Sequence, residues 1–83
     1  MVSPDAELFI LSFAQLTVAL LLSPDNSTYL EALRQIERQL RESFGVTELQ
    51  MVARSTDDYT VAFKLREEQA LLTFPAEEVE NFS

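Results

Sequence analysis

The chain has 83 residues, which leaves room for one domain and is close to the size at which a single core supplies only a few kcal/mol of net stability. It contains no cysteine and no histidine, which excludes disulfides, thiolate nucleophiles, imidazole bases and the commonest zinc sites. Its 14 acidic and 6 basic residues give a net charge of -8, which opposes direct binding to nucleic acid or to an anionic membrane. Hydrophobic residues make up 47% of the chain, so we expect residues 1–83 to form a single folded domain.

The first predicted element is a helix that contains the apolar segment LFILSFAQLTVALLL at residues 8–22. Ser3 is expected to cap this helix, with Pro4 in its first turn, where Asp5 and Glu7 face the positive end of the helix dipole. Fifteen helical residues extend only about 22 Å, which is short of a hydrocarbon core of about 30 Å. The acidic residues before the segment are also unlike a signal peptide. We therefore predict no membrane insertion and a cytoplasmic location.

This helix carries apolar residues on more than one side. One face has four large residues, namely Phe9, Phe13, Leu16 and Leu20. Three further apolar residues lie on another side, namely Leu11, Val18 and Leu22. Because the chain is small and has no other reinforcement, we predict that this second side packs against a second copy in a two-fold homodimer. The alternative is a monomer in which the helix is wholly core.

A turn with the sequence SPDNST at residues 23–28 precedes a second predicted helix. Thr28 and Glu31 match a capping box, and Gly45 is expected to end the helix. Its apolar residues recur at helical spacing, namely Leu30, Leu33, Ile36, Leu40 and Phe44. This element should therefore be an amphipathic helix with one buried face.

The second helix also gathers half of the basic residues of the chain. At 3.6 residues per turn, Arg34, Arg38 and Arg41 fall within about 60° of one another. We consider this strip a candidate contact for a protein partner, because the planar fork of arginine matches carboxylates and phosphate. The alternative, which the acidic surplus favours, is that carboxylates of the protein itself neutralise the strip.

After Gly45 the hydrophobic period changes from 3.6 to 2. In VTELQMVAR (46–54), Leu49, Met51 and Ala53 share one face. A second strand is expected in YTVAFKLR (59–66), and STDD between them predicts a hairpin. Residues 69–74 fit either a third strand or a short helix, and we favour the strand because a lone hairpin covers helices poorly. Residues 76–83 are expected to form a short helix or a frayed acidic tail.

These elements predict an α+β domain in which two N-terminal helices pack on one face of an antiparallel meander of two or three strands. No catalytic set can be assembled from the residues present. The carboxylate pairs stand in turns where water solvates them, and a single glycine excludes the glycine-rich phosphate loops. We therefore expect no enzymatic activity, no metal and no cofactor.

The leading functional hypothesis is a small acidic protein-protein interaction module, such as an adaptor, an inhibitor or a chaperone-like subunit, that is homodimeric. The alternative is an acidic mimic of nucleic acid that blocks a nucleic-acid-binding protein. The mimic requires seven carboxylates to line up, namely Asp57, Asp58, Glu67, Glu68, Glu77, Glu78 and Glu80. A small enzyme is a third hypothesis, which a buried carboxylate in a pocket would favour.

Overall fold

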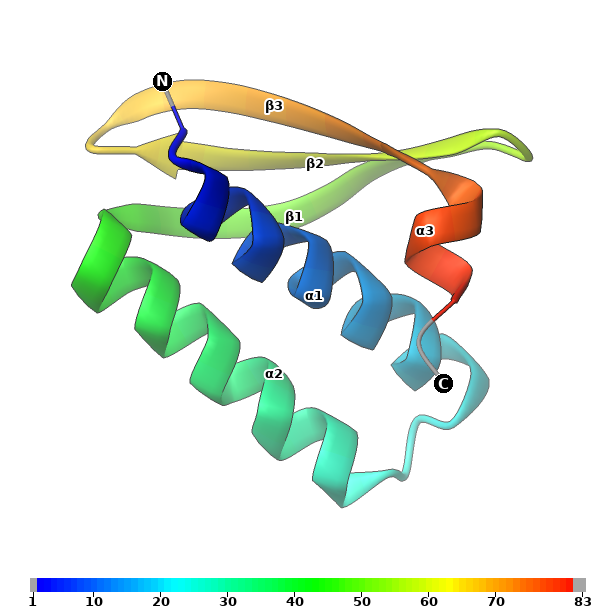
Figure 1. Cartoon of the computed structure of the whole chain (residues 1–83). Coiled ribbons are helices and arrows are strands. Elements are labelled where there is room, and N and C mark those ends of the chain that lie inside the picture. Colours follow the sequence, from blue (N-terminus) through cyan, green and yellow to red (C-terminus); the bar gives the residue numbers. More distant parts are fainter. Residues whose placement is uncertain (1, 82–83) are drawn as a thin grey trace.

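The computed structural model describes residues 2–81 and confirms the predicted α+β fold. The elements are α1 (Pro4–Leu22), α2 (Ser27–Gln39), the π-helical turn η1 (Leu40–Phe44), β1 (Val46–Arg54), β2 (Asp58–Leu65), β3 (Glu68–Pro75) and α3 (Ala76–Glu80). The strands form one antiparallel sheet in the order β1-β2-β3. As Figure 1 shows, α1 and α2 run antiparallel side by side over one face of this sheet, and α3 lies beside the C-terminal end of α1.

The start of α1 follows the prediction. The Ala6 amide donates to Ser3 Oγ at 3.2 Å, and Pro4 is the first helical residue. Proline suits this position because its missing N–H would have no partner within the helix. The side of α1 that faces the sheet is fully packed, with Ile10 and Ala14 both 0% exposed.

The start of α2 differs from the prediction, in which Thr28 was the cap. Asn26 caps the helix instead, with its Oδ1 accepting from the Tyr29 amide at 3.0 Å. Asparagine is among the strongest N-cap residues, and its position places Thr28 inside the first turn. No residue of α2 is fully buried, so the helix packs on α1 less deeply than its apolar periodicity predicts.

The second helix ends in the wider turn η1, which the sequence did not predict. This turn places Leu40 in the core at 0% exposed and brings the Phe44 ring to 5.7 Å from the Phe9 ring, measured between centroids. Gly45 follows with a φ of 70°, a left-handed conformation that glycine adopts without strain. The prediction that Gly45 ends the helix is therefore confirmed.

The sheet confirms the hairpin and the third strand. On its inner face Val61 of β2 lies opposite Met51 of β1 and Leu72 of β3. The pairing of β1 with β2 has two irregularities, and the one between Met51 and Ala53 shifts the register by one residue. Ala53 therefore pairs with Thr60 and is exposed, which corrects its predicted place on the same face as Met51.

The short helix α3 closes the core over the C-terminal half of α1. Its Val79 is 0% exposed, and the Gln15 side chain on α1 donates from Nε2 to the Glu78 backbone oxygen at 2.9 Å. The Tyr59 hydroxyl on β2 donates to Glu80 Oε2 at 2.6 Å, which ties α3 to the sheet. In the segment predicted as a helix or tail, residues 76–80 are helical, and residues 82–83 lie outside the described part of the chain.

Candidate interaction surface

The three residues predicted for the dimer contact do not share one exposed patch. Val18 is only 8% exposed, Leu11 is half-buried and Leu22 is 78% exposed. Val18 belongs to the core because α3 and the sheet cover this side of α1 within the same chain. Sequence reasoning left open what covers that side, since a five-residue helix has a weak periodic signal.

The three arginines of the predicted strip are all exposed. Arg34 and Arg38 lie on α2 and Arg41 lies in η1, where the wider turn departs from the period of 3.6 used to align them. Within residues 2–81 the one ion pair joins Lys64 Nζ to Glu48 Oε2 at 3.1 Å. None of the three arginines forms a direct ion pair within the described part of the chain.

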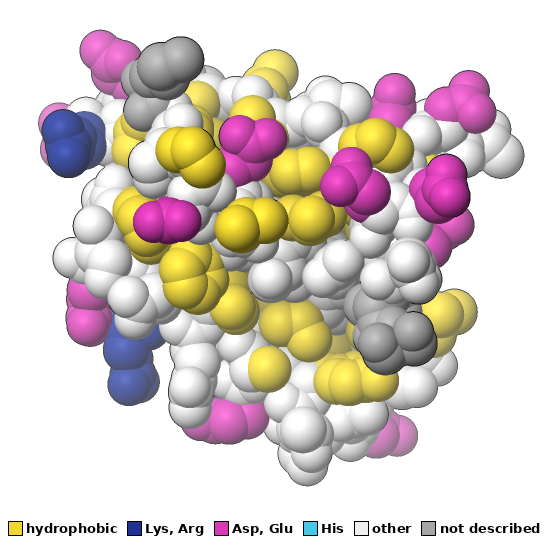
Figure 2. Space-filling view, in the orientation of Figure 1, with side chains coloured by type: hydrophobic (Ala, Val, Ile, Leu, Met, Phe, Trp, Pro, Cys, Tyr) yellow, Lys and Arg dark blue, Asp and Glu magenta, His cyan; other side chains and the backbone are white. Residues whose placement is uncertain are grey.

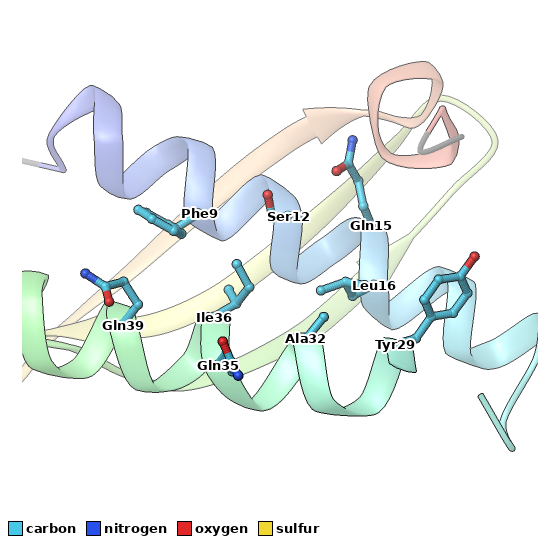
Figure 3. Close-up of a pocket in the computed structure, with 9 residues that line it drawn as sticks. All are labelled: Phe9, Ser12, Gln15, Leu16, Tyr29, Ala32, Gln35, Ile36 and Gln39. Atoms are coloured by element: carbon cyan, nitrogen blue, oxygen red, sulfur yellow. The ribbon is translucent and has the colours of Figure 1, made fainter. Parts of the chain in front are cut away.

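A depression of the surface lies between the two long helices, and we call it the α1–α2 groove (Figure 3). It has a volume of about 520 Å³. Its lining consists of Phe9, Ser12, Gln15, Leu16, Tyr29, Ala32, Gln35, Ile36 and Gln39. None of these nine residues is charged, although the chain carries a net charge of -8.

The groove has an apolar floor and polar amides around it. Leu16 of α1 and Ile36 of α2 lie between the helices, whereas Gln15 points away toward α3 (Figure 3). Gln35 Nε2 donates to Glu31 Oε1 at 3.4 Å, and Gln39 Nε2 donates to Ser43 Oγ at 2.6 Å. A side-chain amide has two donor hydrogens and an acceptor oxygen, so each keeps hydrogen-bonding capacity for a partner molecule.

A second depression lies on the other side of α1, and we call it the α1–β3 groove. It has a volume of about 430 Å³ and is lined by Pro4, Glu7, Leu8, Leu11, Thr73, Phe74, Pro75 and Glu78. Leu8 is 64% exposed and also lines a smaller depression that shares Phe9 and Ser12 with the α1–α2 groove. Figure 2 shows the result as a hydrophobic belt across this face, with acidic side chains beside it.

The seven carboxylates proposed for nucleic-acid mimicry fall into two groups. Asp58 pairs with Pro75, so the β1–β2 turn and α3 lie at the same end of the sheet. Leu65 pairs with Glu68, which places Glu67 and Glu68 at the opposite end. At a rise of about 3.3 Å per residue the two ends of β2 are about 23 Å apart, so the seven carboxylates do not form one row.

Within residues 2–81 no polar or charged side chain is fully buried, and no group of three or more potential metal ligands gathers in one place. The hydrogen bond to Glu80, reinforced by burial and by the negative charge of Glu80, raises the pKa of Tyr59 above its ordinary value, and Arg54 opposes the shift. This hydroxyl already binds Glu80, so we interpret it as a structural contact.

By length and composition α1 is sufficient to cross a membrane, with a mean hydropathy of 1.7 over its most apolar window. Core helices of soluble proteins and signal sequences meet the same criterion, and a third of that window is buried against the rest of this chain.

Comparison of the chain with protein-family models, with curated proteins and with solved structures gives no match. The two grooves and their charge are therefore the features of the molecule from which we infer a function.

Proposed function

We propose that this protein is a small, acidic, non-enzymatic protein-interaction module that works as a homodimer in the cytoplasm, without a metal, a cofactor or insertion into a membrane. The observation that carries the proposal is the α1–α2 groove, which has a volume of about 520 Å³ and no charged residue in its lining. Depletion of charged residues is the compositional mark of the central part of protein interfaces.

The charge of the chain argues for a second copy as the occupant of this groove. Two copies that each carry a net charge of -8 repel one another wherever their carboxylates approach. The α1–α2 groove is a surface at which they can meet without opposing charges. In a two-fold contact Gln35 and Gln39 of one copy face the same amides of the other, and an amide can donate to and accept from an identical amide.

This location replaces the one expected from the helical wheel. Val18 is buried within its own chain. Three apolar residues of the α1–α2 groove are only half-buried and still expose surface to a partner, namely Phe9, Leu16 and Ile36. The proposed dimer would cover this surface. The α1–β3 groove shares no lining residue with this surface, so the proposed dimer would leave it for another partner.

The test is the absolute mass of the protein, measured by light scattering on a sizing column over a hundredfold range of concentration. We expect a dimer for the wild-type chain and a dissociation constant at least about tenfold higher for Gln35→Glu, since a charge opposed by its symmetry mate in an interface costs more than about 1.4 kcal/mol. Gln50→Glu is the matched control, because it makes the same change at an exposed residue of β1.

Two outcomes would contradict the proposal. A wild-type chain that stays monomeric at every concentration would remove the dimer altogether. Equal weakening by Gln35→Glu and Gln50→Glu would attribute the effect to total charge and would exclude the α1–α2 groove as the contact.

A further inference from the structure

The outer edge of the sheet at β3 has no partner strand among residues 2–81. β3 pairs with β2 on one side, and no backbone hydrogen bond from another described element reaches its other side. The register with β2 is unbroken from Leu65 opposite Glu68 to Asp58 opposite Pro75. An unpaired regular edge of this kind presents a row of free N–H and C=O groups to any extended segment.

Soluble proteins usually protect such edges, and β1 at the opposite edge of the sheet is protected. Its pairing is interrupted twice, Glu48 has a positive φ of 54°, and Glu48 forms an ion pair with Lys64. β3 begins at Glu68 and ends at Pro75, but between them residues 69–74 have the sequence QALLTF, which contains no charge, no proline and no glycine, and their pairing with β2 has no irregularity. The central part of the β3 edge is therefore less protected than the β1 edge and is accessible to a partner.

The α1–β3 groove lies beside this edge and supplies side-chain contacts. Thr73, Phe74 and Pro75 of β3 form one wall of the groove, and Leu8 and Leu11 of α1 form the other. Alternate residues of a strand point to the same face of a sheet. Every second side chain of an added strand would therefore face the apolar wall of α1.

The charge of the groove defines the chemistry of the partner. Its two charged residues are Glu7 and Glu78, both exposed, and no lysine or arginine lines it. A partner segment with lysine or arginine beside its apolar residues would complement these carboxylates. A second copy paired through β3 would instead bring Glu7 and Glu78 of two acidic chains together.

We propose that the β3 edge and the α1–β3 groove bind an extended, cationic segment of another protein, in which apolar residues alternate with lysine or arginine. The segment adds to β3 as a fourth strand, its apolar side chains contact Leu8 and Leu11, and its cations approach Glu7 and Glu78. Like the proposed function, this inference requires that the chain recognises proteins, and it depends on the proposed function in no other respect. It concerns a different surface and a different partner from the dimer.

The test uses a fluorescein-labelled ten-residue peptide of alternating leucine and lysine, titrated with the full chain and followed by fluorescence anisotropy. Hydrogen exchange of the backbone amides locates the bound peptide. We expect slower exchange in β3 and no change in β1 or α2. Infrared or circular dichroism spectra of the complex should show added strand and no added helix.

Two matched pairs of variants locate the contact without disturbing the core. The double variant Glu7→Gln with Glu78→Gln should weaken binding about tenfold, while Glu42→Gln with Glu67→Gln should change it less than about twofold. Leu8 and Leu21 are both highly exposed residues of α1, at 64% and 57%, but only Leu8 lines the groove. Leu8→Gln should therefore weaken binding, and Leu21→Gln should leave it unchanged.

Several outcomes would overturn the inference. These are absence of binding, equal weakening by both glutamate pairs, protection of α2 in place of β3, and a peptide that binds as a helix. Dimerisation through β3, seen as loss of the dimer in Leu8→Gln, would make a second copy the occupant. Gln35→Glu should leave peptide binding intact, so failure of the dimer and failure of this inference can be told apart.

Discussion

The two flanks of α1 differ in how completely the chain covers them. Toward the sheet and α3 the inward residues of the helix are packed, with Ile10 and Ala14 at 0% exposed and Val18 at 8%, and the α1–β3 groove lies at the border of this flank with β3. Toward α2 it is half-covered, because no residue of α2 is fully buried and a groove of about 520 Å³ remains between the helices. Both flanks are apolar in sequence, so hydrophobicity alone does not separate core from contact surface.

The difference follows from the number of elements that meet each flank. The inner flank contacts β2 and α3, and the α3 contact is fixed by hydrogen bonds from Gln15 and Tyr59. The other flank contacts a single amphipathic helix, which can cover only a part of a cylinder as wide as α1. The stability of the fold should therefore depend on the flank toward the sheet and α3, and association with another molecule should depend on the flank toward α2. Variants on the two flanks test this difference.

The largest effect is expected for Val18→Asp. An unpaired carboxylate in the core costs at least about 3 kcal/mol, which is comparable with the whole stability of a domain of this size. Val52→Asp is the matched control, since Val52 is 51% exposed and should lose less than about 1 kcal/mol. Urea unfolding followed by circular dichroism measures both.

If Val18→Asp does not fold, Val18→Ala gives a measurable value of about 2 kcal/mol, from the methyl groups it removes and the cavity it leaves. If the Val18→Asp chain folds and is monomeric while the wild type is dimeric, the interpretation of Val18 as a core residue of its own chain is contradicted. Val18 would then lie in a contact between copies, as the helical wheel suggested.

A smaller effect is expected for Tyr59→Phe, which removes the hydrogen bond that ties α3 to the sheet. The bond is to a carboxylate that is itself exposed, so we expect a loss of about 1 to 2 kcal/mol near neutral pH. Tyr29→Phe, in the α1–α2 groove, should change stability by only a few tenths of a kcal/mol. Urea unfolding of the three chains measures the comparison.

The same bond predicts a pH dependence. Because the folded pKa of Tyr59 is raised above the ordinary value of 10.0, its contribution is fully present below pH 10 and is lost as the pH rises through the folded pKa. The difference in stability between wild type and Tyr59→Phe should therefore be constant from neutral pH to about pH 10 and should shrink above it. A difference that grows above pH 10 would contradict the assigned contact.

The sequence predicted some parts of the structure correctly and missed others, including how completely each flank of α1 is covered. Local signals were sufficient for the Ser3 cap, the Gly45 end and the first two strands, because each depends on a few neighbouring residues. They were not sufficient where distant segments decide the outcome. The place of Val18 depends on α3, and the exposure of Ala53 depends on a bulge fixed by pairing with β2.

The grooves were missed for a related reason. The apolar residues of both helices were visible in the sequence, as was the narrow polar stripe with Ser12 and Gln15. The uncharged residues Gln35 and Gln39 on the second helix were also visible in the sequence. Only the packing of α2 on α1 places them beside the polar residues of α1 in one groove. The predicted meander already implies an edge at the third strand, but the groove beside that edge depends on where α1 lies against β3.

The smallest effect on stability is expected for Leu22→Lys, which nevertheless separates the two locations of the dimer. Leu22 is 78% exposed at the end of α1, and a cation there interacts favourably with the helix dipole, so stability should change by less than about 0.5 kcal/mol. If the copies meet in the α1–α2 groove, the mass measured by light scattering should stay that of a dimer. If they meet through Leu11 and Leu22, the new lysine faces its symmetry mate and the dimer should dissociate, which would return the contact to the side of α1 predicted from the sequence.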